Sequence, residues 1–226
     1  MHARSIGACV ALAAIMALAA GGSDVSTHRL DEYLQAARIA LQPDAVTIDL
    51  ELTPGVDVAE SIISAIDTDT DTYSDRDRGR KRDGILSASE QQRYAERVAR
   101  DLAISLDGTP VPLHVTSSTF SDADAFRRGE GTIRLQARAE LPRVSTGTHR
   151  LSFKNAHLPG RSAYLANALL PENPRVSIAA QDRTSDQSEL TIAYALRAEP
   201  PAARPGLLVG LAVAALLLMP LARKNI

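Results

Sequence analysis

The amino-acid sequence predicts a mainly β protein: an antiparallel β-sandwich-like domain with a helix–loop–helix insertion, followed by one C-terminal transmembrane helix. Three observations favour this fold class. Several segments alternate apolar and polar residues with a period of two, which is typical of strands with one buried face. Residues 57–105 contain two segments of helical periodicity joined by a polar loop. Residues 206–222 are apolar on every side.

The N-terminal segment, residues 1–22, has the organisation of a secretory signal peptide. A short basic stretch precedes an apolar stretch at 6–20, and small residues follow where a signal peptidase would cut. Cleavage is expected near Ala19 or Ala20, and the region up to Thr27 is an alternative. The mature chain should therefore begin at or a few residues before the domain at 28–198, which is expected outside the cytoplasm.

Period-two alternation predicts the strands of the domain at 28–198. The clearest strands are expected at 46–52, 132–141 and 189–196, and weaker ones at 33–41, 111–116, 149–154 and 175–180. Segment 162–170 is apolar on both sides, which indicates a central strand. Turn residues at 42–45 and the Asp-Gly pair at 107–108 predict tight connections. Many short strands with such turns indicate an antiparallel sandwich.

Two helices are expected inside the insertion, at 57–66 and at about 88–104. In the second helix, Tyr94, Val98 and Leu102 recur four positions apart, which places them on one face. The loop between the helices is polar and rich in aspartate.

This loop resembles an EF-hand calcium loop at both of its ends. An EF-hand loop has 12 residues, with oxygen ligands at positions 1, 3, 5, 7, 9 and 12 and a glycine at position 6. Counted back from the end, Glu90 takes position 12 and Gly84 position 6, whereas counted forward Asp67 takes position 1. Asp71 and Asp83 compete for position 5. The candidate calcium ligands are Asp67, Asp69, Asp71, Asp83, Ser87 and Glu90.

An insertion separates the two halves, so calcium binding is one of two interpretations. The span from Asp67 to Glu90 is about twice the length of an EF-hand loop. The inserted residues, 71–82 or 72–83, carry several Arg side chains that would repel a divalent cation. A loop can nevertheless leave and return at one point at small entropic cost. In the other interpretation, Ser87 and Glu90 form a capping box that starts the second helix, and the aspartates belong to a solvated loop.

The C-terminal residues predict a membrane anchor. The apolar run at 206–222 is near the lower limit of about 17 residues for a spanning helix. The tail at 223–226 is basic, which places it in the cytoplasm, and the prolines of 199–205 favour an extended linker. The alternative, a buried C-terminal helix, is disfavoured because the run has no polar face. We therefore expect a single-pass protein of the cell envelope with its main domain in the periplasm.

Several segments together resemble a known family. They read "HRLDEYLQAARIALQPDAVTIDLELTPGVDVAESIISAIDTD", "DGILSASEQQRYAERVARDLAISLDGTPVPL", "GTIRLQARAEL", "HRLSFKNAHLPGRSAYLANALLP" and "VSIAAQDRTSDQSELTIAYAL". Over residues 28–198 the chain resembles the extracytoplasmic domain of bacterial proteins related to HupE/UreJ-type nickel/cobalt transporters, including relatives that carry this domain on a single terminal helix. The resemblance implies a compact "IDTDGDGxIS…E" loop, from which this chain departs by its insertion. No multi-helix transporter part is seen, so transport activity is not expected of these residues.

Composition and motifs narrow the expected function. A net charge of −2 and an aromatic content of 4% argue against a nucleic-acid partner. No G-x-S-x-G, H-E-x-x-H or P-loop motif occurs, so enzymatic activity is not expected. The single cysteine, Cys9, lies in the signal peptide, which leaves the mature domain without a thiol.

The sequence thus favours an extracytoplasmic interaction or accessory module, linked to metal transport or envelope assembly through a membrane-protein partner. The alternative is a sensor or buffer that binds calcium in the EF-hand-like loop, or a transition metal at His28. If cleavage exposed His28, its amine and imidazole would chelate nickel or copper, although an ordinary strand-edge histidine is the plainer interpretation. The remaining histidines of the domain are scattered and form no metal motif: His114, His149 and His157.

Overall fold

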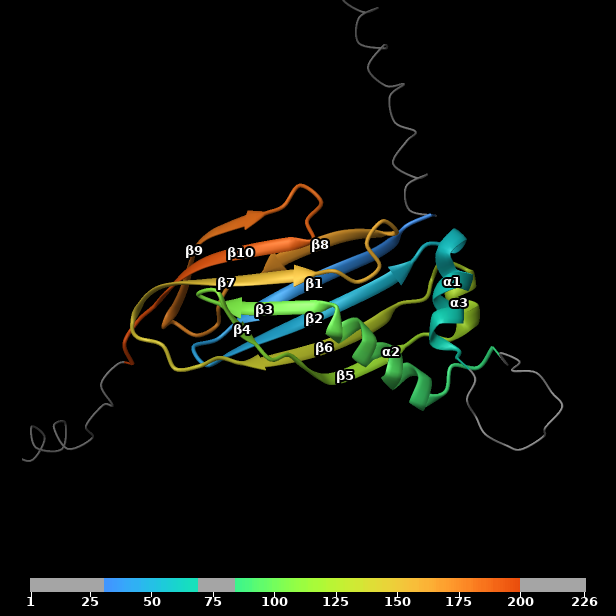
Figure 1. The fold of residues 1–226 in the computed structure, drawn as a ribbon, viewed down its shortest axis with the longest axis horizontal. Coiled ribbons are helices and arrows are strands. Elements are labelled where there is room, and N and C mark those ends of the chain that lie inside the picture. Colours follow the sequence, from blue (N-terminus) through green and yellow to red (C-terminus); the bar gives the residue numbers. More distant parts are fainter. Residues whose placement is uncertain (1–30, 69–83, 200–226) are drawn as a thin grey trace, which may run out of the picture.

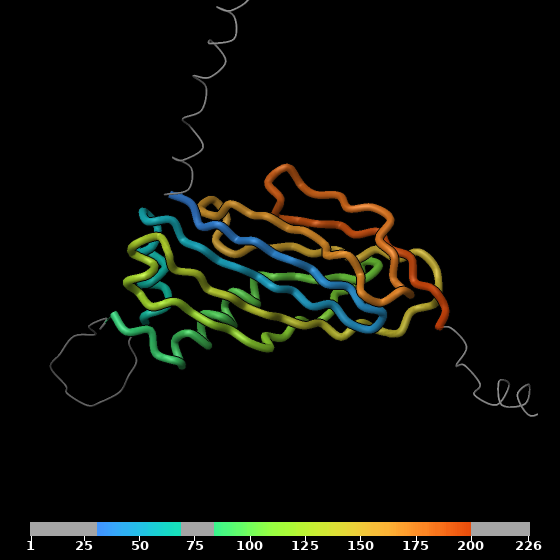
Figure 2. The backbone as a smooth tube through the Cα atoms, turned by 180° about the vertical axis from the view of Figure 1, so that it is seen from behind, coloured from blue at the N-terminus to red at the C-terminus, as the bar shows by residue number. Residues whose placement is uncertain are grey.

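Two five-stranded β-sheets pack face to face in the computed structural model, which describes residues 31–68 and 84–199. Three helices lie within these ranges, two of them at one end of the sandwich (Figure 1). Figure 1 shows one sheet in front, and Figure 2 shows the other sheet from behind. The expected β-rich class with a helical insertion is therefore confirmed.

The first sheet, which we call sheet A, has the strand order β5-β6-β2-β1-β8. Its strands are β1 Tyr33–Leu41, β2 Ala45–Pro54, β5 His114–Phe120, β6 Ile133–Glu140 and β8 Ser162–Ala168. The β1–β8 pair is parallel and the others are antiparallel. The prediction that 162–170 is a central strand is wrong, because β8 is an edge strand. Leu165, on the outer face of β8, is 40% exposed, so the apolar residues on this face of the strand are not buried.

The second sheet, sheet B, has the strand order β4-β3-β7-β10-β9 and is antiparallel throughout. Its strands are β3 Leu102–Leu106, β4 Thr109–Val111, β7 Gly147–Asn155, β9 Val176–Arg183 and β10 Glu189–Leu196. The predicted single strand at 111–116 is wrong, because the chain crosses from sheet B to sheet A between Val111 and His114. Pro112 lies at the crossing, where its missing N–H costs no ladder hydrogen bond.

The core lies between the sheets and consists of the residues that alternation assigned to the inner faces. In β2, four side chains are at most 1% exposed: Val46, Ile48, Leu50 and Leu52. Each such apolar side chain stabilises the fold by about 1.5–3 kcal/mol relative to an exposed one. The same alternation buries Ile133 and Leu135 in β6 and Ile192 in β10.

The helices are α1 Val56–Ile66, α2 Ala88–Arg100 and α3 Ala123–Arg127. Helix α1 packs against α2 and α3 at one end of the sandwich, and α2 also contacts β5 and β3 (Figure 1). The second helix was expected to reach residue 104, which is wrong: it ends at Arg100, and Leu102 begins β3. Leu102 fits the periodicity of a helix and that of a strand. It is four positions after Val98 and also two positions before the inward-facing Ile104.

The described chain begins and ends at opposite ends of the sandwich's long axis. It enters beside the strand end that leads into α1 and leaves after β10 at the far end (Figure 2). Within 31–68 and 84–199 there is no helix long and apolar enough to span a membrane. The signal peptide at 1–22, the anchor at 206–222 and the tail at 223–226 lie outside the described residues, as does His28.

Candidate functional site

Helix α1 ends at a buried carboxylate. Its apolar face packs inward through Ala59, Ile62, Ile63 and Ile66, so the next residue, Asp67, follows the helix into the interior. The Asp67 N–H donates to the Ile63 carbonyl at 2.8 Å, and the residue as a whole is 1% exposed. The last turn of α1 has no basic residue. A negative charge at this end is unfavourable, because the carbonyl end of a helix is itself partially negative.

Helix α2 begins with the predicted capping box. The Glu90 N–H donates to Ser87 Oγ at 3.4 Å, and the Ser87 N–H donates to Glu90 Oε2 at 3.0 Å. The Ser87 hydroxyl also donates to Glu90 Oε2 at 2.8 Å. Glu90 is 4% exposed, and its charge is favourable here because the N-terminus of a helix is partially positive. This part of the interpretation without metal is confirmed.

The two halves of the EF-hand-like loop meet. The Gly84 N–H donates to Asp67 Oδ2 at 3.0 Å, and the Thr68 N–H donates to Glu90 Oε1 at 2.8 Å. Gly84 has a φ of 77°, a conformation that glycine adopts without strain. Asp67, Gly84 and Glu90 therefore lie together at the junction of α1 and α2, although the insertion separates Asp67 from Gly84 in sequence.

One atom at this junction is left over. Asp67 Oδ1 is buried and has no hydrogen-bond partner among residues 31–68 and 84–199. Leaving a buried polar group unpaired costs about 1–3 kcal/mol, and more for a charged group. Such an atom in a folded protein calls for a specific explanation, of which a bound ion is one.

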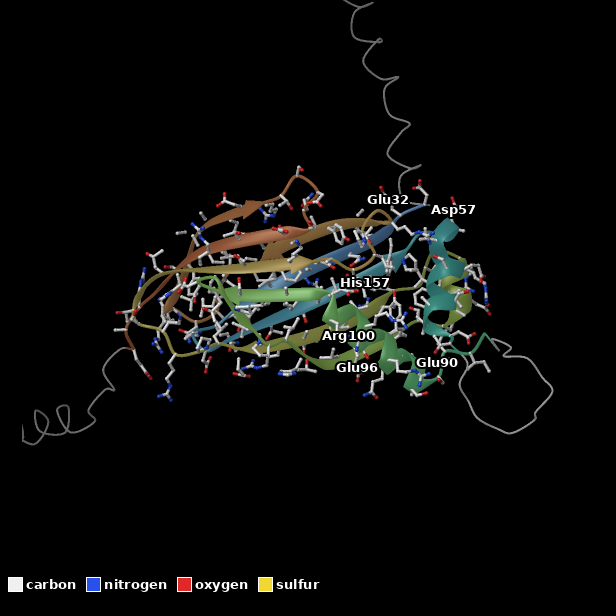
Figure 3. All side chains as sticks on the ribbon, in the orientation of Figure 1. Glu32, Asp57, Glu90, Glu96, Arg100 and His157 are labelled. Carbon is white, nitrogen blue, oxygen red and sulfur yellow. The ribbon has the colours of Figure 1, made fainter. Side chains whose placement is uncertain are left out.

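The structure brings together three of the six candidate calcium ligands. Asp67, Ser87 and Glu90 lie at the junction, whereas Asp69, Asp71 and Asp83 fall outside the described residues. No group of three or more His, Cys, Asp or Glu side chains suited to a metal occurs in the described part of the chain. The described half of the site thus contains the carboxylates of Asp67 and Glu90, and the Oδ1 atom of Asp67 accepts no hydrogen bond within it. Figure 3 shows Glu90 at the start of α2 and Arg100 at its end.

A second buried polar cluster lies at the other end of α2, and the sequence did not predict it. His157 Nδ1 lies 2.7 Å from Asp101 Oδ2, and His157 Nε2 lies 3.2 Å from the Tyr94 hydroxyl. The Tyr94 and Tyr33 hydroxyls are 3.2 Å apart. Because a carboxylate only accepts, Nδ1–H donates to Asp101, and Tyr94 donates to Nε2. We call this cluster the tyrosine–histidine chain.

Every polar side chain of the tyrosine–histidine chain has a partner, and its pKa shifts follow from burial. His157 is 1% exposed, and burial lowers its pKa because a buried imidazole is more costly to charge than a solvated one. Burial likewise raises the pKa of Tyr94 to about 12 and that of Tyr33 well above its ordinary value. These shifts keep all three rings neutral, as a structural cluster requires.

His149 has the opposite environment. Its Nδ1 lies 2.7 Å from Asp107 Oδ2, and its Nε2 lies 2.8 Å from the Ser145 carbonyl oxygen. Two acceptors favour the doubly protonated ring, so the hydrogen bond with Asp107 raises the pKa of His149. The same bond lowers the pKa of Asp107. His149 and His157 thus serve separate structural pairs and do not converge on a shared site.

A groove runs between α2 and β5, one of the two edge strands of sheet A. Two adjoining hollows of about 390 Å³ each share Glu96 and Val115. Small and polar side chains line the groove, including Gln91, Gln92, Ala95, Ala99 and Thr116. Every second residue of an edge strand directs its backbone N–H and C=O away from the sheet. The groove therefore lies along a strand that has such groups.

Comparison of the chain with protein-family models and with curated proteins finds no match. The resemblance to extracytoplasmic domains of HupE/UreJ-type proteins therefore remains a prediction from the sequence.

Proposed function

We propose that the protein is a membrane-anchored extracytoplasmic module that binds calcium at the junction of α1 and α2. The observation that carries the proposal is the buried Asp67 Oδ1 atom, which has no hydrogen-bond partner in the described part of the chain. A cation at this atom would remove the cost of burying it unpaired. It would also neutralise a negative charge at the unfavourable end of α1.

The chemistry of the junction favours a hard cation such as calcium, which binds carboxylate and carbonyl oxygens. Gly84 holds Asp67 Oδ2 from one side, which leaves Oδ1 for a ligand. Glu90 is held at the same junction by Thr68 and Ser87, so its carboxylate lies on the other side of the proposed site. When bound, calcium would supply a positive charge beside the Asp67 carboxylate.

The proposed remaining ligands are Asp69 and either Asp71 or Asp83, which the sequence offers outside the described residues. The insertion alters the ligand spacing of an EF-hand loop and adds basic side chains. Both effects weaken binding. We therefore expect an affinity in the range of extracellular EF-hand modules, about 10⁻⁴–10⁻³ M.

The test is a calorimetric calcium titration of the full chain in detergent micelles. The wild-type protein should release or absorb heat at millimolar calcium, and Asp67→Asn should abolish this signal. Asp57→Asn is the matched control, because Asp57 is an exposed acid in the first turn of the same helix. Glu90→Gln is less informative, since Glu90 also starts α2.

Two outcomes contradict the proposal. One is an absence of heat from the wild-type protein up to several millimolar calcium. The other is an Asp67→Asn protein that titrates like the wild type. Loss of the signal in Asp57→Asn as well would mean that surface charge, and not the junction, attracts the ion.

The anchor and the location of the domain are part of the same proposal. They are supported by the apolar run at 206–222 and by the basic residues that follow it. The full chain should remain in the membrane fraction after alkaline carbonate extraction, whereas a chain that stops at Glu199 should be released. Release of the full chain would contradict the anchor without bearing on calcium.

A second candidate function is an interaction or accessory module for a membrane-protein partner. The groove between α2 and β5 favours it, because an edge strand beside open space suits an added strand of another chain. The resemblance to domains of HupE/UreJ-type proteins suggests a partner in metal transport. A photo-crosslinking residue at Gln92, in the groove, should capture a discrete partner in membranes. The same residue at Thr148, exposed on β7, should not; equal capture at both positions would contradict this function.

A further inference from the structure

The loop between β8 and β9 exposes two consecutive leucines. Leu170 is 91% exposed and Leu169 is 39% exposed, and Leu170 is the most exposed large apolar side chain of the described residues. Burying a leucine side chain is worth about 1.5–3 kcal/mol. These two leucines, the first residues after β8, are therefore exposed apolar surface that a membrane or another protein could cover.

This loop is tied to the place where the chain leaves the domain. Val176, the first residue of β9, pairs with Leu196, the last residue of β10. Beyond them, the Arg197 N–H donates to the Arg175 carbonyl at 2.7 Å, and Arg175 Nε donates to the Arg197 carbonyl at 3.1 Å. The leucine loop and the exit of the chain thus share one end of the sandwich (Figure 2).

The sequence beyond the exit keeps this end near the proposed anchor. Residues 200–205 separate the described domain from the apolar run at 206–222. Six residues span at most about 20 Å. If the apolar run crosses the membrane, the end of the domain that carries Leu170 lies within about that distance of the lipid surface.

We propose that this end of the domain rests on the membrane, with Leu169 and Leu170 inserted into the lipid interface. The inference rests on the proposed anchor. Two leucines are far too small a patch for a stable protein interface, which needs about 800 Å² on each partner. A tethered domain, however, experiences millimolar effective concentrations, so a contact of two side chains is sufficient against lipid.

The charges at this end favour a zwitterionic surface over an anionic one. Arg197 and Arg175 flank the exit, but Arg175 lies 3.8 Å from Glu199, and Glu172 is exposed in the same loop. Insertion into the lipid interface therefore depends on Leu169 and Leu170. With this end on the membrane, the junction of α1 and α2 points away from it, because the helices lie at the opposite end of the sandwich (Figure 1).

The test uses the full chain in nanodiscs of phosphatidylcholine, with and without bromine on the acyl chains. The protein has no tryptophan, so a single substitution supplies the only such fluorophore. Leu170→Trp should show blue-shifted emission and at least about twofold more quenching by the brominated lipid than Leu165→Trp. Leu165 is the matched control, because it is a leucine on β8 that is 40% exposed. Both positions face solvent, so neither change disturbs the core.

Each outcome decides the inference. Stronger quenching of Leu170→Trp supports it. Equal quenching of the two proteins, or blue-shifted Leu170→Trp emission without quenching, overturns it, the latter because protein and not lipid covers the loop. Carbonate extraction of cell membranes that contain the same variants separates the two proposals: a protein that stays in the membrane but shows no quenching in nanodiscs keeps its anchor and loses only the lipid contact.

Discussion

At its first turn, helix α2 holds Glu90 at the junction where Asp67 follows α1, and just after its last turn Asp101 contacts His157. Both ends of the helix thus bury a carboxylate-containing cluster between α2 and the rest of the domain. At the C-terminal end, the polar atoms of the tyrosine–histidine chain are hydrogen-bonded to one another. At the N-terminal end, Glu90 is equally well bonded, but Asp67 Oδ1 has no partner among the described residues.

The difference separates a structural cluster from a functional candidate. A complete polar network fixes the packing of the elements that it joins, and further ligands would have to break its bonds. An incomplete one is costly unless something else completes it. We therefore expect substitutions at the two ends of α2 to differ in their response to calcium, and not only in the stability that they cost.

The largest loss of stability should follow from His157→Ala in the tyrosine–histidine chain, whose polar side chains are all hydrogen-bonded. The change removes one buried and one partly buried hydrogen bond and leaves a cavity, which together lower the free energy of unfolding by about 3–4 kcal/mol. Urea denaturation in detergent measures this value. The stabilisation by calcium should stay unchanged, because His157 lies at the other end of α2.

Asp101→Asn is the conservative partner of that variant. Its amide oxygen can still accept from His157 Nδ1–H, so the loss should be below about 1 kcal/mol. If His157→Ala also removed the response to calcium, the two ends of α2 would be coupled and the contrast between them would fail.

A smaller loss is expected for Glu90→Ala at the junction. The change leaves the N–H groups of Thr68 and Ser87 without their acceptor and removes the capping box. The free energy of unfolding without calcium should fall by about 2–3 kcal/mol. Glu96→Ala, an exposed position on the same helix, should change it by less than about 0.5 kcal/mol. Equal effects would mean that Glu90 acts only through helix charge.

These two ends also differ in how far the sequence could predict them. The spacing of Ser87 and Glu90 is a local signal, and it predicted the start of α2 correctly. The burial of Asp67 depends on how α1 packs. The EF-hand pattern placed Asp67 and Gly84 in one loop, but whether the chain returns across the insertion to bring them into contact is not set by any local pattern. The Asp101–His157 pair joins residues brought together by the pairing of β3 with β7, so periodicity could not predict it.

The same distinction applies to the fold. Strands with one buried face, such as β2 and β10, were predicted because burial imposes a period of two. The prediction was wrong where a residue suits two periods, as Leu102 does, and at β8, where small residues made both faces apolar. Sheet order and the parallel β1–β8 pair are set by long-range packing, which a single sequence does not reveal.

Lowering the pH should reduce the stability that the tyrosine–histidine chain gives to the fold. Burial lowers the pKa of His157 despite the hydrogen bond to Asp101, and the nearby Arg97 acts in the same direction as burial. The neutral ring is therefore favoured by folding, and its stabilising effect is present above about pH 6.5, the unfolded pKa, and lost as the pH falls below it. His149 acts in the opposite sense, because its hydrogen bond to Asp107 raises its pKa.

Nuclear magnetic resonance titration of the histidine rings tests both signs at once. The ring assigned to His157 should titrate below 6.5 and that of His149 above it. A His157 ring that titrates above 6.5 would mean that the ion pair with Asp101 outweighs burial. Acid would then stabilise the tyrosine–histidine chain.

The smallest expected effect has the opposite sign and is the sharpest test of the contrast. Without calcium, Asp67→Asn should raise the free energy of unfolding by about 1 kcal/mol. It removes a buried charge at the negative end of α1, while the amide oxygen can still accept from the Gly84 N–H. With calcium, the wild type should gain stability and the variant should not, so their order should reverse as calcium is added. Denaturation in chelator and in millimolar calcium measures the reversal. A variant that is less stable than the wild type in chelator would show that Asp67 is already satisfied without an ion, and the two ends of α2 would then be alike.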